Sequence, residues 1–129
     1  MEEYIAHIKG IQENETVRLS ENLIVWKEGS SYDVEVTNRQ FDALEKLINE
    51  QKEKPYYLID LSLAGRPSPE IIYLIEKRLK PIKDQIRHAA IYTGNNHLML
   101  IGIKFYFIKF DFPSYSGHGS LKNALKSFV

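Results

Sequence analysis

The amino-acid sequence predicts an α/β fold in which a mixed sheet of four to six strands is flanked by about four helices. The first observation behind this prediction is the order of the segments, because short strand-like runs alternate with runs of helical periodicity along most of the chain. The second is "YYLIDL" at 56–61, which lacks polar–apolar alternation and is typical of a strand buried on both faces. Strands that alternate with helices imply right-handed crossovers, so we expect parallel βαβ units after an N-terminal antiparallel pair.

The antiparallel pair is predicted from residues 15–20 and 22–29, two runs rich in β-branched and aromatic side chains that a short polar turn separates. Residues 31–36, "SYDVEV", alternate cleanly and predict a third short strand. Residues 1–14 carry no strong pattern, and we expect an added edge strand or a loose tail there. The sequence therefore predicts this N-terminal segment followed by a single domain over residues 15–129.

Two helices are predicted in the middle of the chain. The first begins near Thr37, because Thr37 and Gln40 fit a capping box ahead of a periodic apolar run. The second begins at Ser68, with serine as N-cap and proline at the first helical position. Its apolar stripe continues through Pro81, so we expect the proline to bend the helix, with a break as the alternative. The members of this stripe are Ile71, Ile75, Leu79, Ile82 and Ile86.

The last third of the chain predicts two more strands and two more helices. The strands are expected at 88–94 and in "FPSYS" at 112–116, and the helices at 98–110 and from Ser120 onward. The helix at 98–110 is almost wholly apolar but is too short to span a bilayer. No apolar run of about 18 residues occurs in the sequence, so no membrane-spanning segment is expected.

The helix predicted at 98–110 has two apolar faces. At about 100° per residue, one narrow stripe is expected to pack on the sheet, and its members are Met99, Ile103, Tyr106 and Phe110. Because Lys104 and Lys109 must both reach water, the arc between them is expected to face outward. Ile101, Phe105 and Ile108 occupy that arc, and an exposed apolar stripe is typical of a partner-binding surface. The partner is a second copy of this chain or another protein, unless the N-terminal segment or a loop of the same chain covers the stripe.

Composition excludes several classes of protein. Seventeen basic residues balance seventeen acidic ones, which argues against nucleic-acid binding. The absence of cysteine excludes disulfides, thiolate catalysis and cysteine zinc sites, and the acidic start "MEEY" lacks the basic region of a signal peptide, so a cytoplasmic location is expected. The four histidines show no metal-ligand spacing and are expected as lone surface or strand-end residues. We therefore expect no metal and no cofactor.

A resemblance to a known family rests on the order of these motifs over residues 15–129. "YYLIDLS" leads into a helix, "RHAAIYTG" follows that helix, and "SLKNALKSF" comes after a short strand. This order resembles the STAS-like superfamily of anti-sigma-factor antagonists, particularly its small single-domain bacterial members of unassigned function. The resemblance implies a mixed sheet flanked by helices, no catalysis, and function through protein–protein contacts. Some members of the family are switched by phosphorylation of a serine at the start of the helix that follows the central strand.

Ser68 stands at the position that this resemblance marks as a phosphosite. A phosphate there would meet the positive end of the helix dipole and could pair with Arg66. The switchable members carry an Asp-Ser-Ser-Gly type of motif, whereas this chain has Arg-Pro-Ser-Pro at 66–69, so the residues themselves favour a plain N-cap. Asp60 ends the central strand, where open α/β sheets bind ligands, and we expect it to pair with Arg66 or to hold the loop rather than to act in catalysis.

The preferred hypothesis is a non-enzymatic regulatory or scaffolding module that acts through protein–protein contacts, in a homodimer or with another protein. The alternative is a carrier of an apolar small molecule or lipid, because the related CRAL-TRIO fold uses a similar sheet and residues 98–110 are unusually apolar. The two hypotheses differ in what they require of those residues. The first needs an apolar face in water, and the second needs an apolar cavity.

Overall fold

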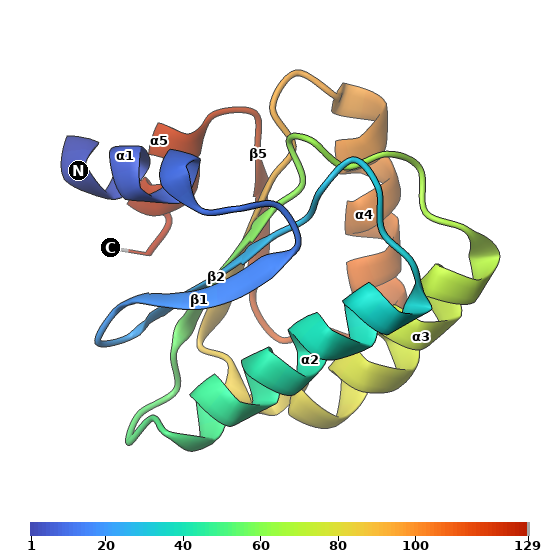
Figure 1. Cartoon of the computed structure of the whole chain (residues 1–129), viewed down its shortest axis with the longest axis horizontal. Helices are drawn as coiled ribbons and strands as arrows, with labels where there is room; N and C mark the ends of the chain where they lie inside the picture. The colour runs from blue at the N-terminus through green and yellow to red at the C-terminus, as the bar shows by residue number, and fades with distance from the viewer. Residues whose placement is uncertain (129) are drawn as a thin grey trace.

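The computed structural model describes residues 1–128 and contains a five-stranded mixed sheet between two layers of helices (Figure 1). The strands are β1 (Glu15–Ser20), β2 (Leu23–Lys27), β3 (Tyr56–Asp60), β4 (His88–Tyr92) and β5 (Tyr115–His118). The helices are α1 (Glu2–Gly10), α2 (Val34–Asn49), α3 (Pro69–Leu79), the 3₁₀ helix η1 (Lys80–Gln85), α4 (His97–Lys109) and α5 (Leu121–Lys126). The predicted α/β class and mixed sheet are confirmed.

The strands lie in the sheet in the order of the sequence, β1-β2-β3-β4-β5. β1 pairs antiparallel with β2, and every later pair is parallel, with Leu58 of β3 opposite Val25 of β2 and Ala90 of β4. Right-handed crossovers between successive parallel neighbours all pass over the same face of a sheet. For this reason α2, α3 and α4 share one face, while α1 and α5 lie on the other (Figure 1).

Each face of the sheet has its own apolar core, because side chains alternate between the faces along each strand. In β3, Tyr57 and Ile59 join Trp26 of β2 in the core beneath α2, α3 and α4. Leu58 points the other way and joins Val25 in the smaller core beneath α1 and α5. The central strand is therefore covered on both faces, as its continuous apolar run predicts.

The prediction for residues 1–14 is wrong, because residues 2–10 form a helix, α1, and neither an edge strand nor a loose tail. Ile8 of α1 is fully buried in the second core. The buried ammonium group of Lys27 donates to the carbonyl oxygens of Ile8 (3.2 Å) and Lys9 (3.1 Å) in the last turn of the helix, where the N–H of Ile11 also donates to the carbonyl oxygen of Ile8. A helix of nine residues leaves only a short periodic signal, and the lysine that anchors it lies 18 residues away in the sequence.

The predicted third strand at 31–36 is also wrong, because this segment contains the start of α2. Asp33 is the N-cap, and its carboxylate accepts a hydrogen bond from the N–H of Val36 at 2.9 Å. The helix begins at Val34, before Thr37, and the residues of the expected capping box are buried within it. Over so few residues, alternation does not distinguish a strand from the first turn of a helix.

The α-helix α3 ends at Leu79, and Pro81 lies in the 3₁₀ helix η1. A proline lacks the N–H that an α-helical turn needs, and its ring crowds the preceding turn. The α-helix therefore breaks before Pro81, where the sequence predicts a bend with a break as the alternative. The apolar stripe nevertheless continues, since Ile82 and Ile86 are buried in the same core as Leu79. The stripe is confirmed, whereas the continuous α-helix is not.

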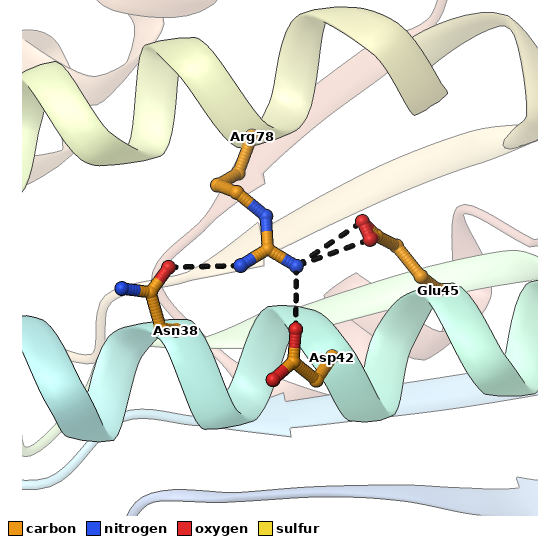
Figure 2. Close-up of polar contacts among 4 residues, drawn as sticks. All are labelled: Asn38, Asp42, Glu45 and Arg78. Carbon is orange, nitrogen blue, oxygen red and sulfur yellow. Dashed lines mark hydrogen bonds and ion pairs between the residues drawn. The ribbon is translucent and has the colours of Figure 1, made fainter.

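The guanidinium of Arg78, in the last turn of α3, ties this helix to α2 (Figure 2). It donates to Oδ1 of Asn38 at 2.8 Å, to Oδ1 of Asp42 at 2.9 Å and to both carboxylate oxygens of Glu45 at 3.0 and 3.1 Å. Its central carbon lies 5.3 Å from the centre of the Phe41 ring. These partners recur every three to four residues on one face of α2, so one arginine holds the two helices in register.

We expect Arg78→Ala to lower the free energy of unfolding by about 1–3 kcal/mol, because it removes the charged hydrogen bonds that join α3 to α2. Arg78→Lys keeps the charge but not the planar fork of donors, and should lose about half as much. Urea denaturation followed by the fluorescence of the single tryptophan, Trp26, measures both changes. A loss below about 0.3 kcal/mol for Arg78→Ala would show that the network is no more than a surface contact.

Candidate functional site

The helix α4 forms where the sequence predicts it and is fixed at both ends. At its start, Asn96 is the N-cap, and its side-chain oxygen accepts a hydrogen bond from the N–H of Met99 at 3.0 Å. At its end, Asp111 is left-handed (φ 55°), and the N–H of Phe112 donates to the carbonyl oxygen of Phe107 at 3.1 Å. This is a Schellman motif, and the ring centres of Phe107 and Phe112 lie 4.9 Å apart across it. The helix is therefore a firm support for its side chains.

The inner face of α4 packs on β5 and on the core beneath α2, α3 and α4. The side chains that enter this core are the predicted Ile103, Tyr106 and Phe110, together with Phe107, while Met99 is half-buried. Gly117 of β5 permits the close approach of the helix, because a Cβ atom there would collide with the side chains of Leu100 and Lys104. The inner face thus completes the core at the edge of the sheet.

The outer face of α4 carries four large apolar side chains that remain in water. Leu98 is 84% exposed, Ile101 67%, Phe105 66% and Ile108 68%, and we call these four residues the α4 stripe. Three of them were expected to face outward, and Leu98 extends the surface by one turn. Together they expose on the order of a few hundred Å² of apolar surface, comparable to the largest patch on a typical monomer.

No segment within residues 1–128 covers the α4 stripe. α1 lies on the opposite face of the sheet, so the N-terminal segment does not fold over the stripe (Figure 1). Lys104 and Lys109 are exposed beside the stripe, and neither forms an ion pair with a carboxylate of the described residues.

Neither α4 nor any other helix in residues 1–128 combines the length and the apolar character that a bilayer-spanning segment needs.

The loop after β3 holds the other predicted site residues without bringing them together. Asp60 is buried and accepts hydrogen bonds from the N–H (3.0 Å) and the hydroxyl (2.6 Å) of Ser62. It therefore holds the loop, and within the described chain it forms no ion pair with Arg66, which is exposed. Ser68 is the N-cap of α3, and its hydroxyl oxygen accepts a hydrogen bond from the N–H of Ile71 at 3.2 Å.

Ser68 lines a hollow of about 400 Å³ between the first turns of α2 and α3. Three carboxylates line the same hollow, those of Asp33, Glu35 and Glu70. Helix N-termini attract anions, but three neighbouring negative charges oppose the addition of a phosphate. Phosphorylation of Ser68 stays a prediction, and the electrostatic surroundings of its hydroxyl count against it.

Two of the histidines expected as lone residues meet on one face of β4 and β5. Oγ of Ser116 lies 2.8 Å from Nε2 of His88 and 2.7 Å from Nε2 of His118, and Nδ1 of His88 lies 2.7 Å from Oγ of Ser114. Burial lowers the pKa of both imidazoles, and the charges of His88 and Lys104 lower the pKa of His118 further. The folded chain therefore favours two neutral imidazoles that share one hydroxyl.

This His–Ser cluster has the hydroxyl–imidazole contact of a hydrolase, but it does not line the hollow beside Ser68. A hydroxyl within hydrogen-bond distance of an imidazole is the contact that activates a nucleophilic serine. The cluster lines neither the hollow beside Ser68 nor a second hollow beside Arg39, and within residues 1–128 no third ligating side chain joins the two histidines as a metal site requires. We assign it the role of linking β5, the edge strand, to β4. A signal in the sequence was the spacing of Ser116 and His118, which places both side chains on one face of a strand.

Comparisons of the chain with protein-family models, with curated proteins and with solved structures find no match. The resemblance to the STAS-like superfamily accordingly stays a prediction. The candidate site rests on the geometry of α4, which is the element of residues 1–128 that combines a firm backbone with a large apolar surface in water.

Glu28, directly after β2, is a buried carboxyl that the sequence does not mark. It is 4% exposed and accepts a hydrogen bond from Nε1 of Trp26 at 3.2 Å, while its Oε1 has no partner in the described residues. Burial raises the pKa of Glu28 to about 7, although the hydrogen bond from Trp26 opposes this shift in part. Folding therefore shifts this carboxyl toward its neutral form, relative to the unfolded chain.

The raised pKa of Glu28 makes stability depend on pH with a definite sign. Folding raises the pKa from 4.5 to about 7, so the protonated carboxyl contributes to the stability of the folded chain. This stabilisation is fully present below pH 4.5 and is lost as the pH rises through 7. Glu28→Gln removes the titrating group, so the variant does not lose this stability as the pH rises. The unfolding free energy of the variant minus that of the unsubstituted protein should therefore be about 2–3 kcal/mol larger at pH 8 than at pH 5.

Urea denaturation at the two pH values measures this difference. Glu50→Gln is the matched control, since Glu50 is exposed and forms no ion pair within residues 1–128, and it should change stability by less than about 0.5 kcal/mol at both pH values. An equal effect of Glu28→Gln at pH 5 and pH 8 would contradict the raised pKa.

Proposed function

We propose that this protein is a non-enzymatic regulatory or scaffolding module that binds another protein chain through the α4 stripe. The observation that carries the proposal is that four large apolar side chains stay exposed on a helix fixed at both ends. Removing apolar surface from water contributes roughly 25 cal/mol per Å² to association, against which the entropy lost on binding is set. A helix fixed at both ends lowers that entropic cost, because little backbone freedom is lost when the partner binds.

Two further observations support the proposal. The resemblance to STAS-like proteins implies function through protein contacts, and the surface expected from the sequence, Ile101, Phe105 and Ile108, is exposed. We place the module in the cytosol, as in the bacterial proteins that the sequence resembles. The partner is a protein, bound in a homodimer or in a hetero-complex.

The alternative, a carrier of an apolar small molecule or lipid, has no comparable support. Such a carrier needs a concave apolar site. The hollow beside Ser68 and a second hollow beside Arg39 are lined largely by polar and charged side chains, among them Glu35, Glu70 and Arg39. The apolar side chains of α4 stand on the outside of a helix, where they suit a contact between two surfaces.

Phe105→Lys tests the proposed contact surface at the middle of the α4 stripe. We expect the variant to fold normally, because the side chain is exposed, and to weaken binding of the partner at least about tenfold, because a charge replaces the central apolar contact. The tagged chain is cross-linked in its native cells to identify the partner, and calorimetry with the purified partner measures the affinity.

Tyr4→Lys is the matched control, since Tyr4 is an aromatic residue, 43% exposed, on α1 at the opposite face of the sheet. Tyr4→Lys should keep the affinity of the unsubstituted protein. If Phe105→Lys unfolds the chain, Ile101→Gln provides a milder change on the same face. Unchanged affinity in both α4 variants would refute the proposed function.

A further inference from the structure

The α4 stripe has the spacing of the contact face of a two-helix pair. Its four residues follow one another at intervals of three, four and three positions, as the a and d residues of a heptad do. In this frame Lys104 directly precedes an a position and is a g residue, and Lys109 directly follows a d position and is an e residue. Both ammonium groups therefore border the groove in which a second helix would lie.

The border of the α4 stripe is basic. α4 contains Lys104 and Lys109 but no Asp or Glu, and neither lysine pairs with a carboxylate of residues 1–128. On α3, Glu76 already pairs with Lys80 at 2.9 Å. This hydrogen bond lowers the pKa of Glu76, and the charge of Lys109 lowers it further. Positive charge is thus in excess around the stripe.

A second copy of this chain would meet like charges in either orientation. In an antiparallel pair of helices the g positions face each other, so Lys104 would face Lys104 of the second copy. In a parallel pair, g faces the e position five residues further on, which places Lys104 opposite Lys109 of the second copy. Like charges beside an apolar contact select against a partner, so the lysines disfavour self-association.

We propose that the partner of the α4 stripe is an amphipathic helix of another protein whose apolar face is bordered by Asp or Glu. This inference rests on the proposed function and adds the chemistry of the partner. Carboxylates at the bordering positions would pair with Lys104 and Lys109 while apolar side chains of the partner cover the stripe. α4 has 13 residues and spans roughly 20 Å, so a partner helix of about four turns matches its length.

Two synthetic helical peptides of about three heptads test this inference. Both carry leucine at every a and d position; one has glutamate at every e and g position, and the other has lysine there, so that like charges keep each peptide from pairing with itself. Fluorescence anisotropy measures the binding of each labelled peptide to the whole chain. We expect the glutamate peptide to bind at least about tenfold more tightly than the lysine peptide, with a difference that shrinks as salt is added.

A charge reversal makes the test specific to α4. The double variant Lys104→Glu, Lys109→Glu should reverse the preference and bind the lysine peptide more tightly. The matched control is Lys122→Glu, Lys126→Glu, because both lysines are exposed on α5, on the other face of the sheet, and the net charge changes equally. The control should keep the preference of the unsubstituted protein, and circular dichroism checks that both variants fold.

Four results would overturn the inference, and they differ in what they leave of the proposed function. Equal binding of both peptides, abolished by Phe105→Lys, would keep the stripe as a contact surface without charge selection. A dimer in light scattering that Phe105→Lys dissociates, with neither peptide bound, would assign the stripe to a second copy. Binding to vesicles of phosphatidylglycerol and phosphatidylcholine in place of the glutamate peptide would assign it to an anionic membrane surface. No effect of Phe105→Lys in any of these assays would contradict the proposed function as well.

Discussion

The order of the parallel strands decides where every helix of this chain lies. β2, β3, β4 and β5 are neighbours in sequence order, so each right-handed crossover passes over the same face and α2, α3 and α4 must share it. The opposite face, which carries Leu58 and Ala90, must then be covered by elements outside the crossovers. α1 and α5 cover it, and the buried ammonium group of Lys27 holds the end of α1 in place.

The same constraint leaves α4 at the end of its layer, over the last strand of the sheet. Its inner face completes the core through Phe107, and its N-cap and Schellman motif hold both ends. Its outer face has no covering element within residues 1–128, yet four apolar side chains stand there between Lys104 and Lys109. Polar residues would suit an unused surface better, and this supports a contact at the α4 stripe whose charged border selects the partner.

Long periodic patterns predict most of this fold, because the stripes of α3 and α4 and the continuous apolar run of β3 depend only on neighbouring residues. The predictions that are wrong concern features set by single contacts between distant segments. α1 depends on Lys27, and the start of α2 depends on the side chain of Asp33. His88 and His118 meet only because β4 and β5 pair in parallel, and Glu28 is buried beside Trp26, whose ring packs on Phe41 of α2. The outer face of α4 was predictable because two lysines border it.

Exposure of the α4 stripe in the isolated folded chain can be measured directly, because the chain contains no cysteine and a single introduced thiol reports its own surroundings. Ile101→Cys places that thiol on the stripe, and Ala124→Cys places it in the core beneath α5, where Ala124 is fully buried. We expect maleimide to label Ile101→Cys within about tenfold of the rate for an unfolded peptide, and Ala124→Cys at least about a hundredfold more slowly. The contradicting result is slow labelling of both thiols at nanomolar protein concentration, which only denaturant speeds up. It would show that the chain itself covers the α4 stripe, so that α4 has no free contact surface.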